Sequence, residues 1–220
     1  MIHVSPTHIG ANKLNLKNLH LKKLGLAFVC AAVLGVGNLS MAKAASESTS
    51  AYQAAMDAMM QSMMVSATGA ADADFLKGMI PHHKGAVAMA QVELKYGKDE
   101  TMRKLATDII AAQNSEIAFM QKWLKGQKLK SLKTSSVAKA AAAKPMENMM
   151  ADMAITYSGN ADTDFARGMV PHHQGAIGMA KVVLKFGKNA EIKKLAEGVV
   201  GAQTSEIALM NDWLTKHPAK

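Results

Sequence analysis

The feature that most constrains this chain is an internal repeat with a period of 90 residues. The segment DADFLKGMIPHH at 72–83 returns as DTDFARGMVPHH at 162–173. Across 71–124 and 161–214, about 30 of 54 positions are identical without a gap. Unrelated segments do not match at this level, so the chain is predicted to contain one structural unit twice.

Each unit is predicted to consist of three helices. Ala, Met, Leu, Lys, Glu and Gln dominate these segments and favour helix, and no sustained strand-like alternation occurs. Pro81 and Pro171 either kink the second helix of each unit or mark the first turn of a new one. The fold class is therefore all-α, a tandem repeat of three-helix units that form one bundle or two, ferritin-like in appearance. The expected helices cover 51–67, 73–96 and 99–125, then 145–157, 163–186 and 190–215.

Several residues mark where the helices should begin and end. Asp72 and Asp162 are expected to act as N-caps and first-turn charges of the second helices. Gly97 and Gly187 stand where those helices should end, each followed by a lysine.

The N-terminal segment has the three parts of an export signal. Lysines at 13, 17, 22 and 23 precede an apolar run over 24–39, and Ala42-Lys43-Ala44 fits cleavage before Ala45. The mature protein is therefore expected in the periplasm, without stable membrane insertion. The predicted organisation is a signal peptide at 1–44, a first helical unit at 45–125, a basic linker at 126–144 and a second helical unit at 145–220.

The cysteine content and the net charge limit the metal ligands and the partners that the mature chain can have. Cys30, the single cysteine, lies in the signal, so the mature chain offers neither a disulfide nor a thiolate. Five of the 26 basic residues and none of the 17 acidic ones precede Ala45, so the formal net charge of +9 becomes +4. With few aromatic side chains for base stacking, nucleic acid is not an expected partner.

Methionines form a stripe on the first helix of each unit. In the first unit the spacing is i, i+3, i+4 and i+7, which is one helix face, and Met64 extends it. Residues 51–67 contain no Leu, Ile or Phe, although the third helix uses such residues freely. Thioethers are soft, neutral ligands that select Cu(I) and Ag(I). The candidate ligands are Met56, Met59, Met60 and Met63, and Met146, Met149, Met150 and Met153. The competing interpretation is a core face, since methionine fills irregular gaps well.

A second motif is Met-x-x-His-His, present once in each unit. Imidazole suits Cu(I), Cu(II), Zn and Ni alike. Adjacent histidines on a helix point about 100° apart, so one ligand per pair is expected, with a structural or orienting role for the other. The competing interpretation is a histidine that is simply hydrogen-bonded in the core. The candidate residues are Met79, His82, His83 and Met89, and Met169, His172, His173 and Met179.

Polar residues interrupt the apolar stripe of the third helix. Gln113 and Glu116 in the first unit correspond to Gln203 and Glu206 in the second. A buried Gln or Glu needs a hydrogen-bond partner, and a histidine of the neighbouring helix is a natural one. The network either fixes helix register alone or also orients a histidine toward a metal.

The residues Asp-x-Asp-Phe-x-x-Gly-Met-[Ile/Val]-Pro-His-His-x-Gly-Ala, followed by Gln-x-x-Glu-Ile and a terminal Trp-Leu, resemble the domain of unknown function 305 family. The resemblance covers both units and implies helical bundles with metal-binding Met and His at the motif positions. It also implies a link to copper, because one family member is a periplasmic copper-binding protein that contributes to copper resistance.

The sequence thus predicts a periplasmic protein that binds copper, with silver as a surrogate, for sequestration, resistance or trafficking. Its partners would be the metal ion and a periplasmic copper efflux or sensor protein. No Glu-x-x-His pair, nucleophile constellation or phosphate loop points to an enzyme, so a ferritin-like metalloenzyme is the less favoured hypothesis. Two non-enzymatic functions also stay open: a bundle that binds haem non-covalently, and a chaperone that uses its methionine faces for clients.

Overall fold

The structure of the protein is a computed structural model that describes residues 35–64, 66–126, 133–152 and 155–218, with side chains at all of these except 35–46, 146, 149, 150 and 152. The chain divides into the units Met1–Gly35 and Val36–Lys220, and both repeats lie in the second. Except for 35–44, the predicted signal peptide falls outside the described residues.

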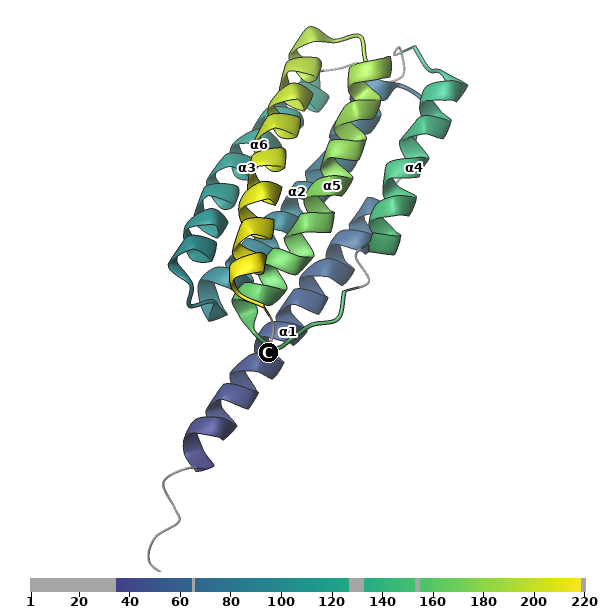
Figure 1. The fold of residues 1–220 in the computed structure, drawn as a ribbon. Coiled ribbons are helices and arrows are strands. Elements are labelled where there is room, and N and C mark those ends of the chain that lie inside the picture. The colour runs from purple at the N-terminus through teal and green to yellow at the C-terminus, as the bar shows by residue number, and fades with distance from the viewer. Residues whose placement is uncertain (1–34, 65, 127–132, 153–154, 219–220) are drawn as a thin grey trace, which may run out of the picture. The chain divides into compact units, whose positions relative to one another are not determined.

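The described part of the chain forms six helices and no strand, which confirms the all-α prediction (Figure 1). The second and third helices of each unit begin and end within two residues of their expected positions. No described helix is both long and apolar enough to cross a bilayer. The helices are α1 (Gly35–Met63), α2 (Ala71–Tyr96), α3 (Glu100–Gly126), α4 (Ser136–Asp152), α5 (Ala161–Phe186) and α6 (Ala190–Lys216).

The first helix of each unit differs most from the expectation. α1 starts at Gly35 rather than near 51, and α4 starts at Ser136, inside the predicted linker. Six of the seven residues from 137 to 143 are alanine or lysine, both good helix formers, which accounts for the early start of α4. α2 and α5 each run through their proline without ending.

The two repeats share one bundle, which is built around α2 and α5. These two helices pack on each other, α3 packs on α2, α6 packs on α5, and α4 packs chiefly on α5. Figure 1 shows α3 and α6 on one side of the central pair and α4 on the other. Since α2 and α5 are equivalent helices, the bundle has an approximate two-fold arrangement of its repeats.

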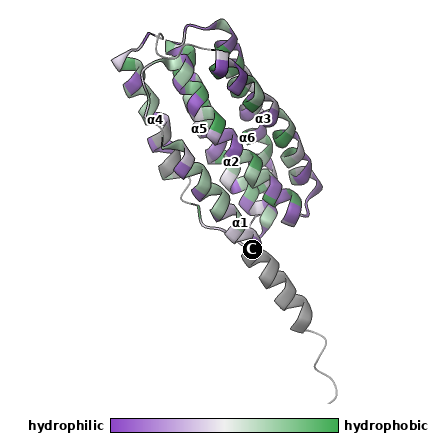
Figure 2. Cartoon of the chain, turned by 180° about the vertical axis from the view of Figure 1, so that it is seen from behind, coloured by the Kyte–Doolittle hydropathy of each residue, from purple (hydrophilic) through white to green (hydrophobic). Residues whose placement is uncertain are grey.

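The described core consists of two large apolar clusters and a small methionine cluster, which each draw on both repeats. One large cluster contains Met89 and Leu105 from the first repeat with Phe165 and Met169 from the second. The other large cluster joins Leu76 and Met79 to residues of α5 and α6 such as Val183. Figure 2 shows hydrophobic residues interleaved with hydrophilic ones along these helices, the pattern of helices with one buried face. Among the described residues, neither repeat has a separate core.

Asp72 and Asp162 lie in the first turns of α2 and α5, as predicted, but neither is an N-cap, so the prediction that they cap these helices was wrong. Asn160 caps α5 by accepting a hydrogen bond from the Thr163 backbone N–H. Asp162 lies inside the helix, and its carboxylate accepts hydrogen bonds of 2.8 Å each from the N–H groups of Lys98 and Asp99 in the other repeat. Asp72 makes the equivalent contact with the N–H groups of 188 and 189. Each carboxylate therefore binds the loop between the second and third helices of the other repeat.

Candidate metal centre

Four buried histidines meet where α2 and α5 pack on each other. His82, His83, His172 and His173 are all 0% exposed. The ring centroids of His82 and His172 are 3.8 Å apart, closer than the two rings within either His-His pair, which are 6.3 Å and 6.0 Å apart. This polar layer lies between the two apolar clusters and combines one His-His motif from each repeat.

The outer histidine of each pair is held by a glutamate. His83 Nε2 lies 2.6 Å from Glu116 Oε2, and His173 Nε2 lies 2.6 Å from Glu206 Oε2. The predicted Glu–His contact is thus present in both repeats, and it fixes the ring orientation of the second histidine. Gln113 and Gln203 are also buried, but their Oε1 atoms have no hydrogen-bond partner within the described ranges.

The inner histidines carry nitrogen atoms that are free of hydrogen bonds. His172 Nε2 lies 3.1 Å from the backbone oxygen of His82, whereas both ring nitrogens of His82 and Nδ1 of His172 have no partner among the described residues. Buried polar atoms without partners are costly, and in native proteins each calls for an explanation.

Both inner imidazoles are kept neutral by their surroundings. Burial lowers the pKa of His82 and of His172 well below 6.5, and the neighbouring imidazoles lower it further. Neutral imidazole is the form that binds copper and other borderline metals. In the described part of the chain, no three His, Cys, Asp or Glu side chains are arranged so that they could hold one ion together. A metal ion here would therefore need a ligand of another kind.

The methionines of α2 and α5 pack across the interface between these helices. Met79 and Met169 are 0% exposed, and Met89 is 2% exposed. Met89 lies against Gly168, and its counterpart Met179 lies against Gly78, where the missing Cβ leaves room. These predicted ligands therefore also serve as core residues, in keeping with the core interpretation of the methionine pattern.

The methionine stripe of α1 gathers into a cluster with a methionine of the other repeat. Met59 and Met63 are 3% and 2% exposed, and Met56, Met60 and Met179 pack against them. These five thioethers are called the thioether cluster below. The side chains of Met146, Met149 and Met150, and the whole of Met153, lie outside the described residues, so the second stripe stays a prediction.

The thioether cluster borders the histidine layer. A Cβ on Gly85 would lie only 2.5 Å from the Met59 sulfur, so the glycine is what allows α1 to approach α2 here. Gly85 follows His82 by three residues, which places it one turn further along the same face of α2. The arrangement brings a thioether next to the turn that carries the unpartnered imidazole.

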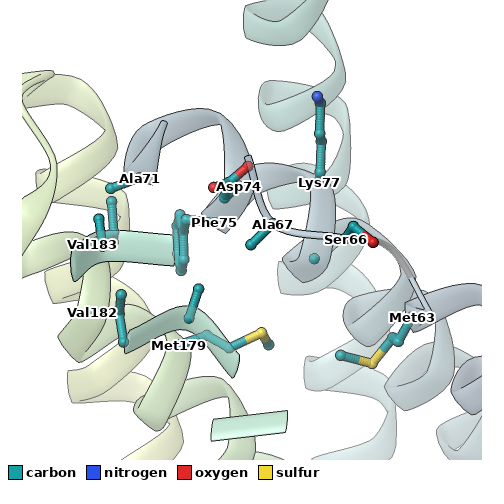
Figure 3. A pocket seen from close by; sticks show the side chains of 13 residues that line it. Met63, Ser66, Ala67, Ala71, Asp74, Phe75, Lys77, Met179, Val182 and Val183 are labelled. Atoms are coloured by element: carbon teal, nitrogen blue, oxygen red, sulfur yellow. The ribbon is translucent and has the colours of Figure 1, made fainter. Parts of the chain in front are cut away.

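A small cavity of about 70 Å³ opens beside the thioether cluster. Met63 and Met179 line it together with Phe75 and Val183, and Asp74 stands at its edge (Figure 3). The Asp74 carboxylate already accepts hydrogen bonds from Thr68 and Gly69. The cavity is therefore chiefly apolar and is lined by two methionine side chains, a surface suited to a soft, weakly hydrated ion.

Two features of this region were not predicted. The contact between His82 and His172 joins residues 90 positions apart and depends on how the repeats pack, which no local pattern indicates. The buried residues Tyr52 and Glu93 were also missed. A usable signal existed for Glu93, because the repeat has Val183 at the equivalent position.

Comparisons with known proteins agree with this architecture. The model of the domain of unknown function DUF305 matches residues 31–124 and 72–214. CopM in its Cu(I)-bound form is 28% identical, with 67% of this chain and 97% of that chain covered and a TM-score of 0.52. CopM has also been solved in Ag-bound and Cu(II)-bound forms.

Two further relatives carry no stated function. A DUF305 protein from Streptomyces coelicolor is 30% identical, with 70% of this chain and 96% of that chain covered and a TM-score of 0.54. An uncharacterized protein of Acanthamoeba polyphaga mimivirus is 43% identical over 58 residues, which are 26% of this chain and 38% of that protein's length. Since the family model spans both repeats, this protein is a member of the DUF305 family with two tandem domains.

Proposed function

We propose that this protein binds a soft metal ion, Cu(I) with Ag(I) as its surrogate, and that it sequesters or carries the ion rather than catalysing a reaction. The observation that carries the proposal is the thioether cluster, in which methionines of both repeats meet around the buried Met59 and Met63. Thioethers do not protonate and prefer Cu(I) to harder ions. CopM, solved with Cu(I), Ag and Cu(II), supports the same interpretation.

The proposed ligand set has two parts. The thioether cluster supplies sulfur, and His82 and His172 supply the unpartnered ring nitrogens. Glu116 and Glu206 orient His83 and His173 through Nε2, and the Nδ1 atoms of these rings also lack partners among the described residues, so these two histidines are further candidate ligands. The imidazoles extend the proposal to Cu(II), which thioethers alone would not favour.

The localisation, the domain organisation and the protein partners complete the proposal. An export signal at 1–44 would place the protein in the periplasm, with repeat units at 45–125 and 145–220 joined by the segment 126–144. A copper efflux or sensor protein would then receive the ion. A chaperone would require methionine faces that are open to clients, but Met59 and Met63 are buried, and only Met64, at 87% exposed, is open in the described stripe.

Anaerobic Cu(I) titration against a competing chelator tests the proposal. The variant in which Met56, Met59, Met60 and Met63 are all leucine keeps hydrophobicity and volume but removes the donor atoms. We expect the bound Cu(I) per chain to fall in this variant. The matched control replaces Met102, Met120 and Met210, which are buried elsewhere in the core, with leucine and should bind as the wild type does. Equal loss in both variants, or loss in neither, would contradict the assignment.

A further inference from the structure

A buried polar cluster joins α1 to the rest of the bundle. The hydroxyl group of Tyr52 on α1 lies 3.2 Å from Glu93 Oε2 on α2 and 3.2 Å from the backbone oxygen of Ala161 on α5. Tyr52 is 1% exposed, Glu93 is 0% exposed, and the ring of Tyr157 stacks on that of Tyr52. Tyr52 thus hydrogen-bonds to both central helices from α1.

No salt bridge balances a negative charge on Glu93 in the part of the chain that the structure describes. Arg103 acts on Glu93 only as a neighbouring charge, and its Nη1 donates hydrogen bonds to the backbone oxygens of Leu94 and Gly97. Glu93 Oε1 has no hydrogen-bond partner among the described residues, and the carboxylate of Asp162 lies close by. A buried carboxylate in this position is unfavourable, so Glu93 is expected to hold a proton.

The environment of Glu93 also favours its protonated form. Burial and the Asp162 carboxylate raise the pKa of Glu93 to about 8, against smaller opposing effects of Tyr52 and Arg103. Asp164 on α5 adds a further negative charge on the Tyr52 side of the cluster. Asp99, at the start of α3, also faces this end of the bundle and binds the Met102 N–H.

The polar cluster is absent from the equivalent place in the other half of the bundle, so the fold itself does not require it. Val183 replaces Glu93, Ala142 replaces Tyr52, and Ala67 replaces Tyr157. These three smaller residues line the cavity beside Met63 and Met179. One half of the bundle thus fills this space with a hydrogen-bonded acid, and the other leaves it partly empty.

We propose that Tyr52, Glu93 and Asp162 form a proton-dependent latch that holds α1 on the bundle while Glu93 is protonated and loosens it when the proton is lost. Ionised Glu93 must reach water or a cation, and separating α1 from α2 is the route to solvent that this contact blocks. Met56 follows Tyr52 by one turn, so the latch holds the helix that carries the methionine stripe. The latch itself does not depend on metal binding and is tested without metal.

The first test is hydrogen exchange of α1 in the metal-free full chain, with wild type and Glu93→Gln compared at the same pH so that intrinsic exchange rates cancel. Because the pKa of Glu93 is raised from 4.5 to about 8, the latch is weakened nearly tenfold for each pH unit between these two values. We expect protection of residues 51–63 in the wild type, relative to Glu93→Gln, to fall roughly a hundredfold between about pH 6 and pH 9, with most of the fall below about pH 8. An identical pH dependence in the two proteins would overturn the proposal.

A second measurement keeps the test decisive if Glu93→Gln fails to fold. Tyr52→Phe retains the acid but removes the hydroxyl contact, so α1 should exchange faster than in the wild type even at about pH 6. The infrared spectrum of the wild type at about pH 7 should contain a protonated-carboxyl band that Glu93→Val, which installs the residue of the second repeat, lacks. Absence of that band, or unchanged exchange in Tyr52→Phe, would rule the latch out.

Discussion

His172 Nε2 lies 3.1 Å from the backbone oxygen of His82, and the centroids of the two rings are 3.8 Å apart. This contact joins equivalent residues of the two repeats at the middle of the bundle. It lies between two apolar clusters, and the outer histidines on either side are tied to Glu116 and Glu206. The protein therefore keeps a row of imidazoles where leucines would pack.

Replacing both inner histidines should not destabilise the metal-free protein. The double variant His82→Leu, His172→Leu removes buried nitrogens that lack partners, so we expect the free energy of unfolding to rise or to stay within about 1 kcal/mol of the wild type. Urea denaturation measures it. A loss above about 3 kcal/mol would show that the imidazoles are needed for packing.

Removing the glutamates should have the opposite effect. Glu116→Ala or Glu206→Ala leaves Nε2 of a fully buried histidine without its partner, which costs about 1–3 kcal/mol each. Thermal and urea denaturation would both report the loss. Glu197→Ala is the matched control, because Glu197 is exposed on α6 and should have little effect. Equal stability of all three variants would argue against a stabilising His–Glu contact.

The stability of the protein should pass through a maximum between mildly acidic and neutral pH. The pKa values of His82 and His172 are lowered from 6.5, so their contribution is present above pH 6.5 and is lost as the pH falls, because the unfolded chain gains protons there. The pKa of Glu93 is raised from 4.5 to about 8, so its contribution is lost as the pH rises through that window.

Melting temperatures measured from acidic to alkaline pH test the acid side and the alkaline side of this stability profile separately. The His82→Leu, His172→Leu variant should flatten the acid side, and Glu93→Val should flatten the alkaline side. If neither variant changes the shape of the profile, other groups control the pH dependence.

A methyl group at Gly85 should displace α1. The Cβ of Gly85→Ala would lie 2.5 Å from the Met59 sulfur, so the side chain or the helix must move. We expect faster hydrogen exchange in residues 51–63 and weaker Cu(I) binding. Gly198→Ala is the control: nothing lies within 4 Å of its Cβ, and it should stabilise α6 by about 0.5–1 kcal/mol. Unchanged exchange in Gly85→Ala would mean that Met59 adjusts alone.

Local patterns predicted most of the fold. The second helix of the first unit is expected at 73–96 and is found at Ala71–Tyr96, because helix propensity and the glycine at 97 act within a few residues. The Glu116–His83 contact also follows from a local rule, since a polar residue on a buried face needs a partner on the neighbouring helix.

Contacts between the repeats could not be predicted in the same way. First-turn acids commonly cap their own helix, which is the expectation for Asp72, yet its carboxylate binds the loop at 188 and 189. The assembly of Met179 with the stripe of α1 likewise depends on the packing of α5 beside α1. These contacts depend on how the two repeats pack around their shared core, so they cannot be predicted from the local sequence pattern of one repeat.

The reciprocal ties of Asp72 and Asp162 bear on how such a chain can arise. Each carboxylate secures a loop that belongs to the other repeat, and neither repeat encloses a core by itself. A half-length protein with this sequence would lack the groups that complete its own loops. Such a half would need a second copy of itself to supply those groups, so joining both copies in one chain makes the completion of each loop intramolecular.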